Sequence, residues 1–221
     1  MADYIKRTIK LMIGLMLYGL GVYLGIQANI GLAPWYAFAM GISLQTGLLF
    51  GNAAMIVSLV VLAVDFLLKE KIGFGTILNG ILVGKFVDLY DWIGLFPKME
   101  NFWLGIVVLL AGQVVICFAS YFYIGAGFGC GPRDSLMVAV AKRLDKLPIG
   151  VIRILVEGTA LLSGWLLGAK VGLGTVIAVF GIGTLMEYIF RMLHFDVKQV
   201  HHEDMKDTSV RIKALLTEKN K

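Results

Sequence analysis

The stretch Gly31-Leu32-Ala33-Pro34-Trp35 interrupts the apolar first half of the chain, and Gly129-Cys130-Gly131-Pro132-Arg133 interrupts the second half about 98 residues later. In each stretch a proline follows glycine-containing sequence, a combination that ends one helix and favours the first turn of the next. A break repeated at fixed spacing in an apolar chain is typical of small, internally duplicated membrane transporters and channels. The sequence therefore predicts two related halves.

The duplication extends beyond the breaks. The segment Lys71–Thr76 reads KIGFGT, and its counterpart Lys170–Thr175 reads KVGLGT. The same register places the acidic residue Asp88 opposite Glu187. The two glycine-rich segments lack the further glycine of a dinucleotide fingerprint, so we interpret each as a turn whose threonine caps the next helix.

The composition argues for a membrane protein. The chain is 58% hydrophobic and 16% charged, whereas soluble domains carry roughly 25% charged residues. The net charge of +5 comes from basic residues at the ends of apolar segments, which indicates membrane topology rather than a nucleic-acid surface. The cysteines, Cys117 and Cys130, are not spaced as a metal site or a redox pair. No cofactor, no metal site and no catalytic residues are predicted.

The lengths of the apolar segments predict two kinds of helix before the polar tail, which begins near residue 194. The shorter apolar segments, 34–46 and 132–145, begin with a proline and reach only roughly 20 Å at 1.5 Å per residue, too short to span a bilayer comfortably. We interpret them as half-helices. The predicted long helices are 9–28, 51–68, 74–93, 102–124, 149–168 and 174–193.

Charge placement selects a topology. If both half-helices turn back without crossing, the chain has six spans and both termini lie on the side that holds most of the basic loop residues. With eight spans, Lys69 and Lys71 would move to the opposite side, which fits the positive-inside rule less well. We therefore expect a multi-pass protein of the bacterial cytoplasmic (inner) membrane with both termini cytoplasmic.

Three crossings per half require the halves to have opposite orientation. The predicted fold class is an all-α polytopic membrane protein with six transmembrane helices plus two re-entrant half-helices, arranged as 3+3 inverted repeats. The expected organisation is a cytoplasmic N-terminus (1–8), membrane repeat 1 (9–97), membrane repeat 2 (98–193) and a solvated cytoplasmic polar tail (194–221).

Several of these motifs resemble one known family. The segments Ala28–Trp35 and Gly125–Asp134, followed by Arg153, Glu157 and the glycine-threonine element, are similar to the YitT/YczE-like bacterial integral membrane proteins. The resemblance covers roughly residues 10–193. It implies a membrane location and adds no substrate.

The two breaks are the predicted binding site. A half-helix that starts inside the membrane presents unpaired N–H groups and the positive end of its dipole, which suits an anion. Arg133 would add a full charge, whereas the matching Trp35 offers a flat apolar surface. An alternative is that Arg133 and Asp134 anchor the helix start at the membrane surface. The candidate substrate-binding residues are Asn29, Gly31, Pro34, Trp35, Gly129, Gly131, Pro132, Arg133 and Asp134.

Other charged residues lie inside predicted membrane helices. Arg153 and Glu157 are four apart and can pair, either as a proton-coupling site or as a structural ion pair. Asp88 and Glu187 are either gates at opposite faces or interfacial carboxylates. Asp65 is expected to extend toward Lys69 at the membrane surface.

The favoured function is a membrane transporter or channel for a small polar or anionic solute. The expected partners are the lipid bilayer and that solute; glycine-rich helix faces permit a homodimer, and no nucleic-acid partner is expected. The main alternative is a non-transporting accessory or regulatory membrane protein that acts on a partner. A weaker alternative is an intramembrane lipid enzyme using Asp88 or Glu187, but no acidic cluster supports it.

Overall fold

The computed structural model describes residues 2–144, 146–200, 202–205, 207–208 and 210. Within these ranges the chain is helical and contains no β-strand, so the all-α prediction is confirmed. The elements are α1 (Ala2–Gln27), α2 (Pro34–Thr46), α3 (Phe50–Leu67), α4 (Phe74–Ile93), α5 (Phe102–Gly125), α6 (Pro132–Arg143), α7 (Ile149–Leu166), α8 (Leu173–Met192) and the 3-10 helix η1 (Val197–Gln199).

The helix bounds follow the glycine and proline signals closely. Most ends agree with the prediction to within two residues, and the main difference is that α1 begins at Ala2 instead of residue 9. Four described helices are long and apolar enough to cross a membrane: α1 from Tyr4 onward, α3, α5 and α8. The protein is therefore a membrane protein with several apolar helices.

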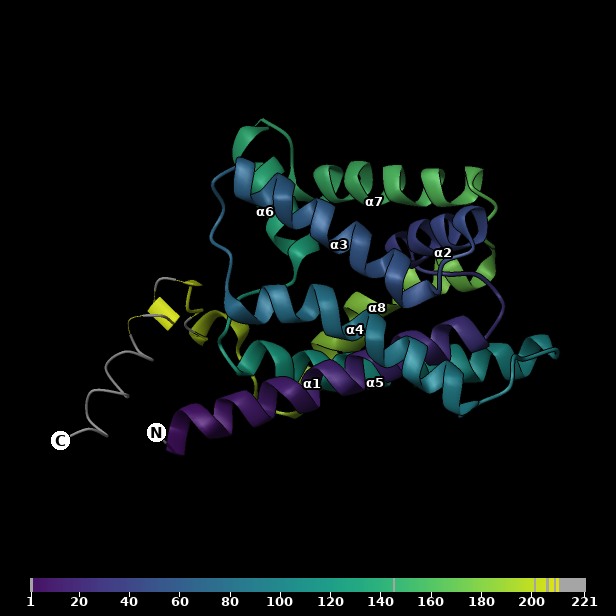
Figure 1. Cartoon of the computed structure of the whole chain (residues 1–221), viewed down its shortest axis with the longest axis horizontal. Helices are drawn as coiled ribbons and strands as arrows, with labels where there is room; N and C mark the ends of the chain where they lie inside the picture. Colours follow the sequence, from purple (N-terminus) through teal and green to yellow (C-terminus); the bar gives the residue numbers. More distant parts are fainter. Residues whose placement is uncertain (1, 145, 201, 206, 209, 211–221) are drawn as a thin grey trace.

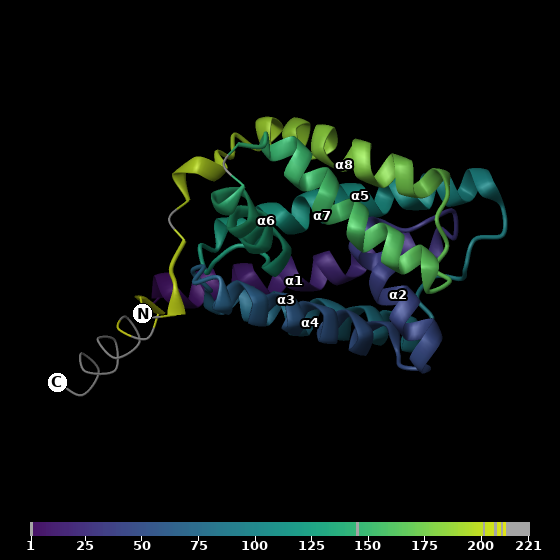
Figure 2. The ribbon, with the colours of Figure 1, turned by 90° about the horizontal axis from the view of Figure 1, so that it is seen from above.

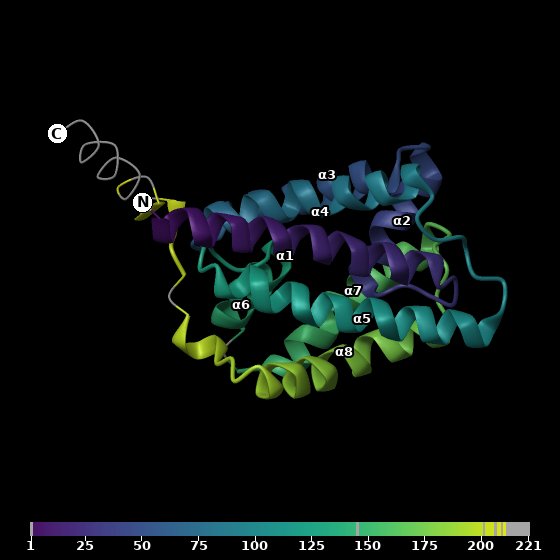
Figure 3. The ribbon, with the colours of Figure 1, turned by 90° about the horizontal axis from the view of Figure 1, so that it is seen from below.

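The six long helices run side by side along the molecule, and the two short helices occupy opposite ends of it (Figures 1, 2 and 3). The N-terminus and the described part of the tail lie at the end that holds α6. Each half contributes its short helix to the other half, since α2 packs on α7 and α6 packs on α3.

The central contact is the crossing of α1 with α5, the most extensive in the molecule. A Cβ atom at Gly21 would lie 2.7 Å from the carbonyl oxygen of Gly112, and a Cβ at Gly112 would lie 2.8 Å from that of Gly21. Glycine lets two backbones approach closely where lipid provides no hydrophobic drive between helices.

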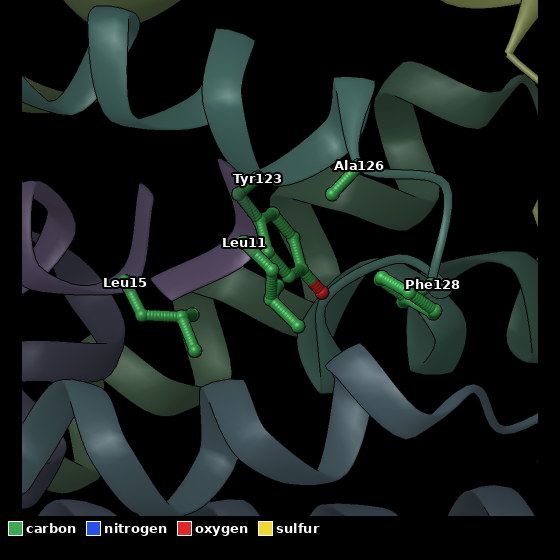
Figure 4. Close-up of a cluster of buried hydrophobic side chains, with 5 residues drawn as sticks. All are labelled: Leu11, Leu15, Tyr123, Ala126 and Phe128. Atoms are coloured by element: carbon green, nitrogen blue, oxygen red, sulfur yellow. The ribbon is translucent and has the colours of Figure 1, made fainter. Parts of the chain in front are cut away.

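Next to this crossing, a buried cluster joins α1, the end of α5 and the second break. Figure 4 shows its side chains, with Tyr123 beside Leu11 and the Phe128 ring on the loop that follows α5. The cluster fixes where the second break leaves α5. Its members are Leu11, Leu15, Tyr123, Ala126 and Phe128.

Each break is hydrogen-bonded to the start of a helix from the opposite half. The N–H of Gly174 donates to the carbonyl of Ile30 at 2.9 Å, and the N–H of Gly75 donates to the carbonyl of Phe128 at 2.7 Å. The two bonds connect equivalent positions. The halves also share their left-handed backbone positions, which pair as Asn29 with Gly127, Gly31 with Gly129, and Lys69 with Gly168.

The halves differ in how their last two helices pack. In the first half α3 contacts α4, and a Cβ at Gly84 would lie 2.5 Å from the carbonyl oxygen of Gly51. At the corresponding glycines of the second half, Gly150 and Gly183, a Cβ atom would have no neighbour within 4 Å. Helices α7 and α8 make no comparable contact.

The described part of the tail is mostly exposed or half-buried, but Glu203 and Thr208 are buried, so the prediction of a solvated tail is wrong at these two residues. The carboxylate of Glu203 pairs with Arg7, and its N–H donates to the carbonyl of Gly127 at 2.9 Å. The N–H of Met205 donates to the carbonyl of Ile72. Basic residues at the ends of apolar segments were expected only to mark topology, but the Arg7 guanidinium also donates to the carbonyls of Ala126 and Gly127 after α5, in addition to its ion pair with Glu203.

Replacing Gly84 with alanine should lower the thermal unfolding temperature of the purified protein. The new Cβ would lie 2.5 Å from the Gly51 carbonyl oxygen, and overpacking of this kind costs about 1–3 kcal/mol. Gly183→Ala is the matched control, because open space surrounds that position. An equal loss of stability in both variants would contradict the difference between the halves.

Replacing Arg7 with alanine should release the tail. Glu203 is only 4% exposed, and removing the cation of a buried ion pair costs about 3–5 kcal/mol. Limited proteolysis in detergent should then cleave the segment around residues 196–208 faster than in the wild type. Lys6→Ala, which removes an exposed neighbouring charge, should leave the cleavage rate unchanged, and equal rates in all three proteins would exclude this contact.

Candidate functional site

The starts of the two short helices meet. Pro34 and Pro132 occupy the first helical positions, and the residues before them are extended and provide no side-chain cap. The guanidinium carbon of Arg133 lies 5.5 Å from the centre of the Trp35 ring. Because α2 and α6 then run to opposite ends of the molecule, their uncapped N-terminal N–H groups and positive dipole ends converge on one region (Figure 2).

Two aromatic rings hold Arg133. Its guanidinium carbon is 4.6 Å from the centre of the Tyr36 ring, in addition to its contact with Trp35. Within the described residues, Arg133 makes no hydrogen bond and no ion pair with another side chain. Cation–π contact occupies the face of the guanidinium and leaves its in-plane N–H donors available.

Asp134 is the third residue of α6 and lies among charged and phenolic groups of several helices. Its side chain is exposed, although groups from four helices act on it electrostatically. These groups are Tyr18 on α1, Tyr123 on α5, Arg133 on α6, and Arg153 and Glu157 on α7. This position argues against the alternative in which Arg133 and Asp134 form a simple anchor at the membrane surface.

Arg153 and Glu157 form the expected pair. The Arg153 Nε donates to Glu157 at 2.9 Å, and the Glu157 side chain is the more buried of the two. Both residues act on Asp134, so the pair lies beside the region where the half-helices meet. The cluster of Tyr18, Trp35, Tyr36, Arg133, Asp134, Arg153 and Glu157 is called the central cluster below.

Three of the predicted site residues have other contacts. The amide of Asn29 donates to the carbonyl of Met99 and accepts from Lys170, so the structure does not bring it into the central cluster. Gly31 and Gly129 have φ values of 123° and 108°, a left-handed region that favours glycine. Both glycines pack closely against helix starts of the other half.

The two expected gate residues have different environments. The Asp88 carboxylate accepts from the N–H of Gly51 at 2.7 Å at the α3–α4 contact. Glu187 is exposed and pairs with Arg191 on its own helix at 2.9 Å. Neither residue reaches the central cluster, and the difference between them follows the difference in helix packing between the halves.

The prediction that Asp65 extends toward Lys69 is wrong. Asp65 is fully buried, whereas Lys69 is exposed in the turn after α3. Asp65 shares a helix face with the buried residues Ser58 and Leu62, which pack toward α4 and α6. The small residues Gly51, Ala54 and Ser58 lie on the same face of α3 as Asp65, and they were the available sequence signal that a neighbouring helix covers this face.

A groove runs beside the central cluster, between α2, α6 and α7. Its volume is about 390 Å³, and its lining is largely apolar with two hydroxyl groups. Trp35 belongs to both the groove and the cluster, so the two are continuous. The lining residues are Trp35, Phe38, Leu136, Leu155, Val156, Thr159, Ala160 and Ser163.

Two tyrosines of the cluster were not predicted as site residues. Tyr36 directly follows Pro34-Trp35, and its position in the first turn of the predicted half-helix was the available signal. Tyr18 lies in an apolar helix that contains no motif. Its place in the cluster depends on how α1 packs against the start of α2.

Comparisons with known proteins identify relatives of this chain. Residues 5–191 match the model of a family described as "Family of unknown function (DUF6198)". An uncharacterized protein of Haemophilus influenzae is 32% identical over 193 residues, which cover 85% of each chain. The uncharacterized membrane protein YczE of Bacillus subtilis is 29% identical over 177 residues, covering 79% of this chain and 81% of the relative. The YczE-like resemblance is thus confirmed. No solved structure matches the chain.

Proposed function

The chain belongs to the family of unknown function DUF6198, and from that premise we propose that it is a membrane transporter for a small organic anion. The observation that carries the proposal is the Arg133 guanidinium, held on the rings of Trp35 and Tyr36 with its N–H donors available. It lies where two uncapped helix N-termini meet, an arrangement that favours negative charge.

The proposed architecture has six crossings, two re-entrant half-helices and 3+3 inverted repeats. It is supported by the position of α2 and α6 at opposite ends of the molecule (Figure 3) and by the reciprocal hydrogen bonds of the breaks. The α6 end carries the basic residues Lys142 and Arg143, which bind Glu70 and the Leu68 carbonyl of the α3–α4 loop. By the positive-inside rule this end is cytoplasmic, in a bacterial inner membrane.

The charges of the central cluster restrict the class of ligand that this site can bind. The formal charges of the two basic and two acidic side chains cancel, so the excess positive potential comes from the helix N-termini and from the available in-plane N–H donors of Arg133. A monoanion fits this balance better than a strongly charged polyanion. The adjacent groove offers about 390 Å³ of mostly apolar space for the remainder of the molecule.

The unequal packing of the halves supports a carrier. If equivalent halves can exchange conformations, α7 would close on α8 while α3 separates from α4, and the site would open to the other side. The glycines that such a closure requires, Gly150 and Gly183, stand at the positions that correspond to Gly51 and Gly84. Glu187 would then take the place that Asp88 has at the closed contact.

Cysteine accessibility in intact bacterial cells tests the topology. In a background without Cys117 and Cys130, a membrane-impermeant thiol reagent should label Lys98→Cys from outside. Lys71→Cys should react only after the cells are permeabilised, because six crossings place its loop in the cytoplasm. Eight crossings would reverse both results.

Ligand binding and flux test the function. Small monocarboxylates, phosphate and sulfate are screened for thermal stabilisation of the purified protein, and a stabilising anion is then followed into proteoliposomes. Arg133→Ala should weaken binding at least tenfold, because hydrogen bonds to charged groups contribute about 1.5–3 kcal/mol. Arg133→Lys should recover little of the lost affinity, since an ammonium group lacks the planar face with which the guanidinium stacks on aromatic rings. Glu157→Gln tests the predicted proton coupling by the same uptake assay.

Lys142→Ala is the control, because it removes a basic residue that lies outside the central cluster. The proposal fails if no anion in the panel stabilises the protein or is taken up. It also fails if Arg133→Ala and Glu157→Gln both transport as the wild type does.

A further inference from the structure

Asp65 in α3 is a carboxyl group that the central cluster does not use. It is fully buried, and neither of its oxygens has a hydrogen-bond partner among the described residues. An ionised carboxylate is stable inside a membrane protein only when it is paired or hydrated. The neutral acid is therefore the form that this conformation accommodates.

The charged groups near Asp65 do not neutralise the negative charge that its ionised form would carry. Glu70, the charged group that acts on it electrostatically, is itself acidic. On α6, Lys142 pairs with Glu70 at 2.7 Å. Arg143 donates to the carbonyls of Leu68 and Ala139, both at 2.8 Å, and makes no ion pair with Asp65.

The remaining charged side chains near α3 are either exposed or bound to other partners. Lys69 and Lys71, in the loop after α3, are exposed. On α4, Lys85 binds the side chain of Asn52 and Asp88 accepts from Gly51, both near the opposite end of α3. An ionised Asp65 would attract a nearby cation, so the use of backbone carbonyls by Arg143 is consistent with a neutral Asp65.

The internal repeat shows which contact Asp65 occupies. Its counterpart in α7 is Gly164, where a Cβ would lie 2.4 Å from the backbone of Ala37 in the half-helix α2. In the first half, α3 packs on the half-helix α6, and the face that carries Asp65 lies beside Pro132, since a Cβ at Gly80 would contact both Ser58 and Pro132. From this equivalence we infer that the Asp65 carboxyl group lies at the α3–α6 contact, where the other half has only hydrogen.

We propose that Asp65 is a proton-binding site that couples proton movement to the position of α6, and hence of Arg133. When the α3–α6 contact opens to cytoplasmic water, the carboxylic acid transfers its proton to water and the carboxylate stays hydrated. The contact closes again only after the carboxylate has taken a proton from water. The coupling to solute movement rests on the transport function proposed above.

Distance measurements between α3 and α6 test the proposal without a known solute. Spin labels are attached at the exposed positions Leu67 and Val138 in the full chain in lipid nanodiscs, with Cys117 and Cys130 replaced. The wild-type background should show a short distance at acid pH and a longer one at alkaline pH. Asp65→Asn, which mimics the neutral acid, should keep the short distance throughout. Glu70→Gln should retain the shift.

An infrared spectrum at neutral pH provides a second readout, since the carbonyl band of a protonated carboxyl group should disappear in Asp65→Asn. If that variant does not fold, Asp65→Gly, which reproduces the residue of the other half, replaces it. Absence of the band in the wild-type protein, absence of a pH-dependent distance, or a shift that survives in Asp65→Asn would overturn the proton site. If these results appear as expected but no anion is taken up, the proton site stands and the proposed transport function fails.

Discussion

Backbone hydrogen bonding at the two breaks is the constraint on which the rest of this structure depends. A helix that stops and restarts between lipid-facing helices leaves N–H and C=O groups that water cannot satisfy. Here the carbonyls of Ile30 and Phe128 accept from Gly174 and Gly75, at the helix starts of the opposite half. Both breaks can therefore persist, and they bring the starts of α2 and α6 together.

Duplication explains the scaffold, and divergence explains the site. The halves share their helix lengths and left-handed positions, but one break carries Trp35 where the other carries Arg133. Identical residues at these positions would give two stacked rings or two repelling cations. The difference produces a cation held on aromatic rings. Asp65 and its counterpart Gly164 also differ between the halves, since one half carries a carboxyl group at the position where the other has only hydrogen.

Local signals account for what the sequence predicts well. Glycine and proline set the helix ends, and a spacing of four residues is sufficient to pair Arg153 with Glu157. The interactions that sequence reasoning missed join distant segments. Arg7 and Glu203 are separated by almost the whole chain, and the burial of Asp65 depends on which helix covers its face. Such contacts follow from packing, which periodicity in one apolar segment does not encode.

The reciprocal bonds between the breaks have a consequence for biosynthesis. When the first half has entered the membrane, the Ile30 carbonyl and the Gly75 N–H still lack the partners that residues 128 and 174 supply. The unsatisfied groups keep the first break unstable in lipid until the second half arrives. The two halves thus mature together, and a chain truncated after α4 would be a substrate for quality-control proteases rather than a folded half-protein.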